Sequence, residues 1–187
     1  MIIAITGFAT SGKDTFFKLL AEDNPKHIRV AFADELKKTA APYIKSLYNI
    51  DIFNCTPEDK EIARSILIAI GCWARDNISD TYWVDKTIEQ IRKLVHQGYI
   101  PTICDFRFKS EIVRLQQEFG EQNVIGVEII RTDSEYTPPQ KEIENRPFLI
   151  DYIDYTVEWP TVESLDKKEL FKYIEEFKEW NSSVKNN

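Results

Sequence analysis

Short apolar runs and longer amphipathic stretches follow one another along the chain. Almost continuous apolar runs at 2–6, 27–33, 99–104 and 123–130 are typical of strands that are buried on both faces of a sheet. A shorter run at 154–159 predicts a fifth strand. Because helical patterns lie between these runs, the sequence favours a mainly parallel sheet with helices on both faces.

Helices are expected where apolar residues recur every three or four positions. Their predicted starts or spans are, in chain order, near Gly12, at Asp34, at Pro57, 81–96, 109–119 and 164–180. Thr56 is a typical N-cap for a helix that begins at Pro57, and Asp34 is a second capping candidate. In the helix after Pro57, the predicted buried stripe consists of Ile62, Ile66, Ile70 and Trp73.

Two segments lack such a pattern. Residues 132–149 are polar, contain three of the eight prolines and show no clear period, so we expect a mobile loop or short lid. The tail at 181–187 is expected to fray. The chain has 187 residues, of which 43% are hydrophobic, and it shows no repeat and no long linker. One compact α/β domain over residues 1–187 is therefore expected.

The charge balance narrows the class of partner. Lys and Arg number 24 against 31 Asp and Glu, which gives a formal net charge of −7. This balance argues against a duplex DNA or a membrane surface as partner, because both require a basic face. A small anionic ligand remains compatible with it, because a few Arg and Lys residues focused in a cleft can bind such a ligand.

The cysteines and the first residues predict the compartment. Cys55, Cys72 and Cys104 show no CxxC spacing and no nearby His cluster, so neither a zinc site nor a disulfide framework is expected. Residues 1–7 lack the charged leader of a signal peptide, and no apolar stretch has transmembrane length. We therefore expect a soluble, cytoplasmic protein with reduced thiols.

The segment from Gly7 to Lys13 carries the strongest chemical signal. It reads Gly-Phe-Ala-Thr-Ser-Gly-Lys, which has the G-x-x-x-x-G-K spacing, and it lies between a predicted strand and a predicted helix. In such a loop, backbone N–H groups converge on phosphate oxygens, and the helix N-terminus adds partial positive charge. The predicted ligand is ATP, held by Gly7, Thr10, Ser11, Gly12 and Lys13, with Lys13 bridging the β- and γ-phosphates.

The predicted magnesium site departs from the usual pattern of this loop. The position after the lysine is normally Ser or Thr, but here it is Asp14, and Thr15 follows. A carboxylate suits Mg²⁺ as well as a hydroxyl does, so both residues remain candidates. Asp105 is a third predicted ligand, because the strand that it ends should lie beside the first strand. The alternative for Asp105 is a helix N-cap.

From the phosphate loop onward, the sequence resembles the deoxynucleoside monophosphate kinases of tailed phages. The likeness is carried in order by Ser11-Gly12-Lys13-Asp14-Thr15, Ala31-Phe32-Ala33-Asp34-Glu35-Leu36-Lys37, Ile70-Gly71-Cys72 with Arg75, Tyr82-Trp83-Val84, and Asp105-Phe106-Arg107-Phe108 with Glu111. It reaches Arg131 and, more weakly, residues 154–157, so it spans most of the chain. The family usually has Gly-Thr in place of Gly71-Cys72 and proline in place of Glu35.

This resemblance implies a three-layer P-loop NTPase fold of the nucleoside monophosphate kinase type, with a mainly parallel five-stranded sheet. The implied activity is transfer of the γ-phosphoryl group of ATP, with Mg²⁺, to a deoxynucleoside monophosphate. An acceptor-binding helical part is implied at about 34–97 and a lid-like loop at about 132–149. The implied acceptor contacts are Asp34, Lys37, Arg75, Trp83, Arg107 and Glu111, and Arg131 is an implied contact to ATP. Lys13, Asp105 and Arg107 are the implied catalytic residues.

Several of these side chains also have a purely structural interpretation. Arg107 could form a surface ion pair with Glu111, and Arg75 could be a solvated arginine at a helix end. Helical spacing places at least one of Tyr82 and Trp83 in the core, which competes with stacking on a nucleobase. A plain loop position is favoured for Arg146, although it could also close over the ATP phosphates.

Other functions also remain open at this stage. One is a kinase for another small metabolite, of the phosphomevalonate or dephospho-coenzyme A type, and another is a kinase of hydroxymethylated bases in phage DNA. The acidic balance and the lack of a Lys/Arg run disfavour the DNA kinase. A nucleotide-gated switch that hydrolyses ATP slowly is a non-kinase alternative. The acidic helix at 164–180 could pack on the sheet or form part of a homodimer contact.

Overall fold

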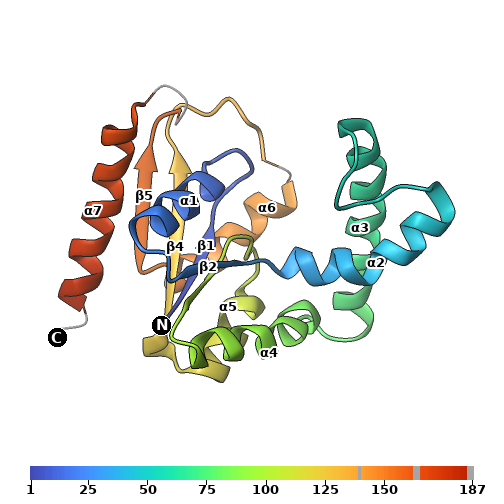
Figure 1. Cartoon of the computed structure of the whole chain (residues 1–187), viewed down its shortest axis with the longest axis horizontal. Helices are drawn as coiled ribbons and strands as arrows, with labels where there is room; N and C mark the ends of the chain where they lie inside the picture. The colour runs from blue at the N-terminus through green and yellow to red at the C-terminus, as the bar shows by residue number, and fades with distance from the viewer. Residues whose placement is uncertain (139, 162–164, 185–187) are drawn as a thin grey trace.

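The sheet forms the centre of the molecule. The computed structural model describes residues 1–138, 140–161 and 165–184. Five strands pair in the order β2-β3-β1-β4-β5, and every pairing is parallel (Figure 1). Their bounds are β1 Ile2–Thr6, β2 His27–Val30, β3 Ile100–Ile103, β4 Val124–Arg131 and β5 Tyr155–Trp159. The predicted five-stranded parallel sheet is therefore confirmed.

Helices cover both faces of this sheet. The α-helices are α1 Lys13–Asp23, α2 Phe32–Tyr48, α3 Pro57–Asn77, α4 Tyr82–His96, α5 Lys109–Phe119, α6 Gln140–Asn145 and α7 Lys167–Val184. Short 3-10 turns are η1 Glu121–Asn123, η2 Arg146–Phe148 and η3 Ile150–Tyr152. Successive side chains of a strand point to opposite faces, so Ile2 packs with α4 and α5 while Ile3 packs with α1 and α7. This confirms the predicted three-layer α/β architecture.

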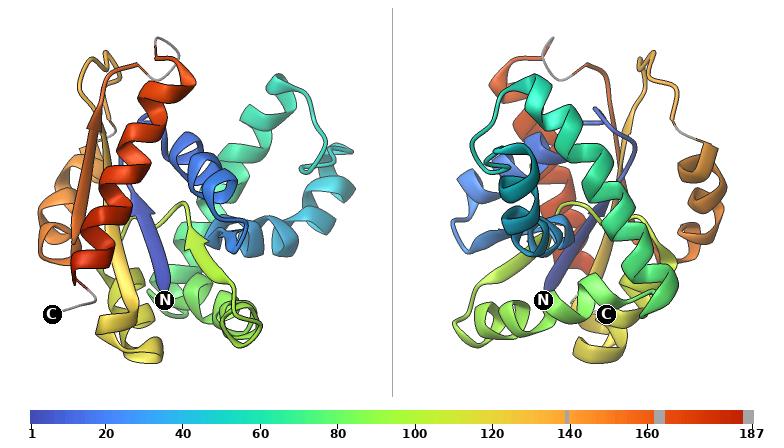
Figure 2. Two further views of the ribbon diagram at one scale, coloured as in Figure 1. Left: turned by 60° about the vertical axis from the view of Figure 1, so that its left-hand side comes forward. Right: turned by 90° about the vertical axis from the view of Figure 1, so that its right-hand side faces the viewer.

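Helices α2 and α3 project away from the sheet as an arm (Figures 1 and 2). The arm has a small core of its own, which consists of Ala40, Ile44, Ile50, Ile52 and Ala63. Large apolar side chains such as Tyr43, Leu47 and Phe53 remain exposed on its surface. None of the described helices combines the length and the apolar character that a membrane crossing requires.

The second strand and the helix after it differ from the prediction. Strand β2 ends at Val30 instead of Ala33, and α2 begins at Phe32 with Ala31 as its N-cap. The prediction that Asp34 caps this helix is therefore wrong, because Asp34 lies inside the first turn. Its carboxylate pairs instead with Arg29 at 2.8 Å.

The buried stripe of α3 also differs from the prediction. Ile62 is 46% exposed and Trp73 is 59% exposed, whereas Ala63, Gly71 and Ala74 are buried. Small residues are buried here because α3 packs closely on its neighbours: a side-chain carbon at Gly71 would lie 3.1 Å from Leu36. The prediction that Thr56 caps this helix is confirmed, because its hydroxyl accepts a hydrogen bond from the N–H of Asp59.

The segment predicted to be a loop contains ordered elements. Within 132–149, α6 and η2 form, and six residues are too few to show a helical period in the sequence. The predicted start of the last helix at Ser164 lies outside the described residues. Helix α7 continues to Val184, so the expected fraying from Asn181 onward is wrong for Asn181–Val184.

Candidate functional site

The loop between β1 and α1 has the conformation that its sequence predicts. Gly7, Thr10 and Gly12 have positive φ angles of 138°, 63° and 96°. Gly7 must lack a side chain, because a Cβ there would lie 2.3 Å from the carbonyl oxygen of Ile129. Lys13 is the first residue of α1, so the helix N-terminus faces the loop. This geometry can converge backbone N–H groups on an anion.

Trp159 at the end of β5 supports the loop from below. Its indole N–H donates to the carbonyl oxygen of Ser11 at 2.8 Å, and its side chain is fully buried against Phe16. A Cβ at Gly12 would lie 2.7 Å from the indole ring. Sequence reasoning missed this role, because nothing around position 159 indicates that a residue so distant in the chain contacts the loop. The only local sign is the requirement for glycine at position 12.

Lys13 is the charged group at the centre of the loop. Its Nζ donates to the carbonyl oxygens of Gly7 at 2.7 Å and Phe8 at 2.6 Å. Burial, and then the charge of Arg107, lower the pKa of Lys13 to about 8, although nearby carboxylates act in the opposite direction. Those carboxylates are Asp14, Glu142 and Asp105. Lys13 therefore lies within electrostatic reach of several predicted site residues.

The residues of the loop fit a phosphate chain. The hydroxyl of Ser11 is the only buried side-chain polar atom without a hydrogen-bond partner among the described residues. Such an atom is usually satisfied by a ligand or water.

The predicted magnesium ligands differ in exposure. Asp14 is exposed and Thr15 is partly buried. The described part of the chain has no group of three or more His, Cys, Asp or Glu residues that could hold a metal ion. Asp14 and Thr15 stay predicted magnesium ligands.

Asp105 links the sheet to the arm. It comes shortly after β3, and β3 pairs with β1 as predicted. Its two carboxylate oxygens accept hydrogen bonds from the backbone N–H groups of Phe32 and Ala33, both at 2.9 Å. Burial raises the pKa of Asp105, and these two hydrogen bonds oppose the rise. The carboxylate thus stabilises the N-terminus of α2, where the sequence suggested a cap on the helix that follows Asp105.

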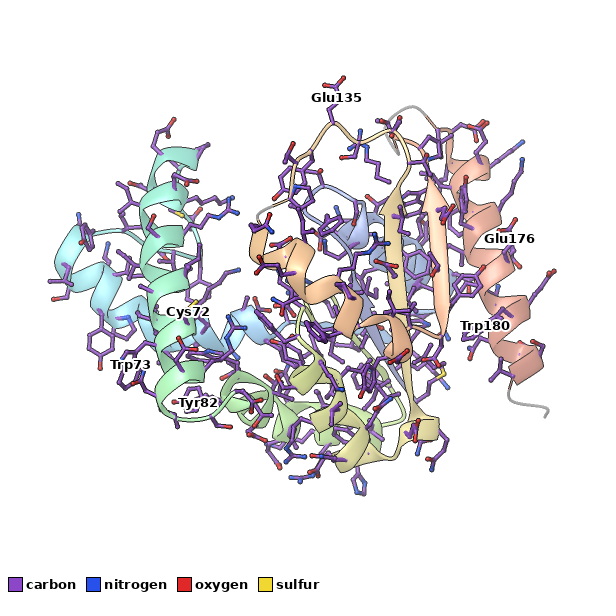
Figure 3. All side chains as sticks on the ribbon, turned by 180° about the vertical axis from the view of Figure 1, so that it is seen from behind. Cys72, Trp73, Tyr82, Glu135, Glu176 and Trp180 are labelled. Atoms are coloured by element: carbon purple, nitrogen blue, oxygen red, sulfur yellow. The ribbon has the colours of Figure 1, made fainter. Side chains whose placement is uncertain are left out.

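A cavity of about 640 Å³ separates the arm from the loop and from α6. Its cationic lining residues are Lys37, Lys60, Arg64, Arg75, Arg107 and Arg146, and its acidic ones are Asp105, Glu111, Glu128 and Glu142. Apolar walls come from residues including Phe8, Leu36, Leu67, Ile68, Phe108 and Leu149. In Figure 3, Cys72 lies on the side of α3 toward this cavity and Trp73 on the outer side. The volume is typical of a small-molecule site.

Arg75 and Glu111 build one wall of this cavity. The guanidinium of Arg75 lies 3.9 Å from the centre of the Phe108 ring and 3.9 Å from the Glu111 carboxylate. Glu111 also accepts hydrogen bonds from the backbone N–H groups of Arg107 at 2.7 Å and Phe108 at 3.0 Å. Burial raises the pKa of Glu111 to about 7 against the effect of these partners. The Glu111 carboxylate therefore holds the loop that carries Arg107.

Arg107 and Arg146 connect α6 and η2 to the rest of the site. The half-exposed Arg107 side chain donates to Glu142 of α6 at 2.6 Å, so the alternative interpretation of Arg107, a side-chain ion pair with Glu111, is wrong. Arg146 donates to Glu128 of β4 at 2.7 Å, and it also lies 5.7 Å from the centre of the Phe8 ring. The plain loop position favoured for Arg146 is wrong, because Arg146 lines the cavity.

The remaining predicted residues differ in how they relate to the cavity. Lys37 lines it, but the lining does not include Asp34, whose carboxylate pairs with Arg29 and Lys37. Trp83 borders the cavity but is only 6% exposed, and its indole N–H donates to the carbonyl of Gly71. This burial leaves little of the ring available for base stacking. The expectation that at least one of Tyr82 and Trp83 belongs to the core is confirmed, since Trp83 is a buried member of the main core.

Arg131 contacts the phosphate loop but is not among the residues that line the cavity. Its guanidinium donates to the carbonyl oxygen of Thr10 at 3.3 Å and to the hydroxyl of Thr161 at 2.5 Å, and it pairs with Asp133. The cavity lining also contains residues to which sequence reasoning assigned no role, namely Phe8, Glu128 and Glu142. They are separated along the chain and meet only through the sheet order.

Known proteins resemble this chain in fold. No protein-family model and no curated protein matches the sequence. Two similar solved structures are a sugar kinase from Janibacter sp. and the shikimate kinase from Aquifex aeolicus. The sugar kinase is 13% identical with a TM-score of 0.51, over 97% of this chain and 94% of that chain. The shikimate kinase is 18% identical with a TM-score of 0.50, over 97% of this chain and 98% of that chain. The chain therefore shares the fold of these two kinases.

Proposed function

We propose that this protein is an ATP-dependent kinase that phosphorylates a small phosphorylated molecule, a deoxynucleoside monophosphate. The observation that carries this proposal is the cavity that begins at Gly7 and Phe8 of the phosphate loop. Its walls offer Lys37, Arg75 and Arg107 as cations together with extensive apolar surface. A site that combines cations and apolar walls beside a phosphate loop suits an acceptor with a phosphate and a base.

On the donor side, the loop would hold the phosphates of ATP. The backbone of the loop, the Ser11 hydroxyl and Lys13 provide the donors. Arg131 contributes by holding the Thr10 carbonyl in place. A bound Mg²⁺ would offset phosphate charge, with Asp14 or Thr15 and Asp105 as its proposed ligands.

On the acceptor side, we assign the phosphate to the arginines. Arg107 presents a guanidinium that can bind a phosphate with two parallel hydrogen bonds. Arg75 is fixed by Phe108 and Glu111, so it adds a cation at low entropic cost. The nucleoside would then lie against the apolar walls of α2 and α3, and Trp83 would support those walls from the core.

Catalysis in this proposal rests on positioning and on charge. Lys13 and Arg107 stabilise the charge that spreads over the transferring group, and neither forms a covalent bond to it. Glu111 keeps Arg107 in place through the backbone N–H of Arg107. Such a reaction requires no strong base from the protein, because alignment of the reacting groups provides much of the acceleration.

The proposed partners are small molecules. The formal net charge of −7 supports a small acceptor over stable binding of nucleic acid. All three cysteines are free of disulfides, which supports a reducing cytosol as the compartment. Homodimer formation remains a proposal without a residue assigned to it.

The test is coupled ADP release from Mg·ATP with a panel of acceptors. The panel contains dAMP, dGMP, dCMP, dTMP, hydroxymethyl-dUMP, the matching ribonucleotides and a reaction without acceptor. We expect release with one or a few deoxynucleotides that is at least tenfold faster than without acceptor. Release that is equal with and without every acceptor would contradict kinase activity and would indicate a slow ATPase switch.

A second candidate is a kinase for a metabolite that is not a nucleotide. The observation that favours it is the fold shared with a sugar kinase and a shikimate kinase. The panel therefore also includes shikimate, simple sugars, phosphomevalonate and dephospho-coenzyme A. Acceptor-dependent release with one of these and with no nucleotide would decide for this candidate.

A further inference from the structure

Glu142 of α6 pairs with Arg107, the arginine to which the proposed function assigns the acceptor phosphate. Its Oε1 lies 2.6 Å from Nη1 of Arg107, and both side chains line the cavity. The carboxylate is the better buried partner, since its side chain is 23% exposed against 51% for Arg107. The cation assigned to the acceptor is therefore already neutralised by an anion of the same chain.

The same carboxylate also acts on the phosphate loop. Arg107 lowers the pKa of Lys13, and Glu142 acts in the opposite direction, so both lie within electrostatic range of Lys13. Glu142 thus belongs to the group of charges between the donor lysine and the acceptor arginine. A phosphate dianion that entered this position would meet a carboxylate at short range, which is unfavourable at any dielectric constant.

Charged groups make the described contacts between the segment that carries Glu142 and the rest of the cavity wall, namely the pairs of Glu142 with Arg107 and of Arg146 with Glu128. Ile143 on α6 is 43% exposed, so the helix contributes little apolar burial of its own. Beyond α6, Arg146 donates to Glu128 at 2.7 Å, and Leu149 is the first residue that enters the main core. The contacts that hold Glu142 over Arg107 are thus of the kind that an anionic ligand can replace.

We propose that Glu142 is an internal competitor for the acceptor phosphate and that it sets the specificity of the site against small free anions. This inference rests on the proposed function. An acceptor that also contacts the apolar walls of α2 and α3 gains enough binding free energy to displace the carboxylate. Inorganic phosphate lacks those contacts, so the pair between Arg107 and Glu142 excludes it. A small anion that is abundant in cells would therefore not occupy the acceptor site.

The test compares Glu142→Gln with Glu144→Gln. Glu144 lies on the same helix, is exposed, pairs with Gln140 and does not line the cavity, so its variant controls for the loss of one charge on α6. The protein is saturated with a non-hydrolysable ATP analogue, which fills the phosphate loop, and the binding of radiolabelled inorganic phosphate is measured by equilibrium dialysis. We expect Glu142→Gln to bind phosphate about twofold to fivefold more tightly, which is the upper part of the range for a partly exposed ion pair. Glu144→Gln should match the unmodified protein.

A second pair of variants tests whether Arg107 is the group that is released. In an Arg107→Gln background, adding Glu142→Gln should change phosphate binding less than twofold, because there is no guanidinium to release. Equal or weaker phosphate binding by Glu142→Gln in the Arg107 background would overturn the inference, as would the same gain in both backgrounds. If the ATP analogue itself does not bind in the dialysis cell, the proposed function fails instead, so the two failures are distinguishable.

Discussion

The phosphate loop and the arm lie on opposite sides of one cavity, yet they are built in contrasting ways. The loop is fixed by packing against the central core: Trp159 is fully buried beneath it, and Gly7 and Gly12 have no room for a side chain. The arm has a separate small core, and large apolar side chains such as Tyr43 remain exposed on it. Position is therefore tightly specified on the donor side and loosely specified on the acceptor side.

This contrast indicates where each half of the function is encoded. A phosphate chain is the same in every ATP molecule, so a rigid loop can match it. Acceptors vary, and the walls that would contact them come from helices with few buried contacts. Changes on the loop side should therefore affect turnover and stability strongly, whereas changes on the arm should mainly affect acceptor affinity.

The largest expected effect is at Lys13. Lys13→Ala removes the cation that the loop directs at the phosphates, and turnover should fall by about 100- to 1,000-fold. The fold should persist, because Lys13 is only partly buried and the two hydrogen bonds that its Nζ donates to described residues go to the loop itself. Acceptor-dependent ADP release and circular dichroism measure the two properties. A folded variant with nearly normal turnover would falsify the assigned role of the loop.

The next largest effect is at Glu111, a buried carboxyl in the cavity wall, and it concerns the pH dependence of stability. Its pKa is raised from 4.5 to about 7 by burial, so the fold favours the protonated carboxyl, and this contribution to stability is lost as the pH rises from about 4.5 to above 7. The difference in unfolding free energy, Glu111→Gln minus unmodified protein, should therefore increase by about 3 kcal/mol as the pH rises from 4.5 to 8. Urea unfolding across this pH range measures the difference. Parallel pH profiles for the two proteins would refute a raised pKa.

A matched pair of tryptophans tests the contrast directly. Trp159→Phe removes the hydrogen bond to Ser11 and part of a fully buried side chain, and we expect a loss of about 2 kcal/mol in unfolding free energy with weaker ATP binding. Trp73→Phe on the exposed face of α3 should change stability by less than about 0.5 kcal/mol and leave ATP binding unchanged. Thermal unfolding and ATP titration of both variants provide the data. Similar losses of unfolding free energy and ATP affinity in the two variants would contradict the proposed difference between loop and arm.

The smallest expected effect is at Arg75. Arg75→Lys keeps the charge but loses the planar group over the Phe108 ring, so the KM for the acceptor should rise about fivefold, which corresponds to about 1 kcal/mol. The KM for ATP should not change, because Arg75 lies on the arm side of the cavity. Steady-state kinetics with each substrate varied in turn separate the two constants. An increase confined to the KM for ATP would contradict the assignment of Arg75 to acceptor binding.

The sequence predicted the features that depend on local chemistry. The five strands, their parallel arrangement, the phosphate loop and the cap at Thr56 were all predictable from short patterns of residues. The approach of β3 to β1 followed from the usual order of strands in such sheets. These features were accessible because each depends on neighbouring residues or on a general rule of chain connection.

Features that depend on distant contacts were not predictable. Asp105 accepts hydrogen bonds from the first two residues of α2, although it lies about 70 residues further along the chain. The small residues that α3 buries look less apolar than Trp73, which remains exposed. Glu142 lies in a polar stretch without a period, and only the folded chain brings it to Arg107.

The bond between Trp159 and Ser11 also has a consequence for how the protein is made. The two residues are 148 positions apart, so the support beneath the loop cannot form until β5 has been synthesised. During translation, the first strand and its loop therefore stay incompletely packed until almost the whole chain has been synthesised. Nucleotide binding should begin late in synthesis, and a chain that stops before β5 should have no ability to retain ATP.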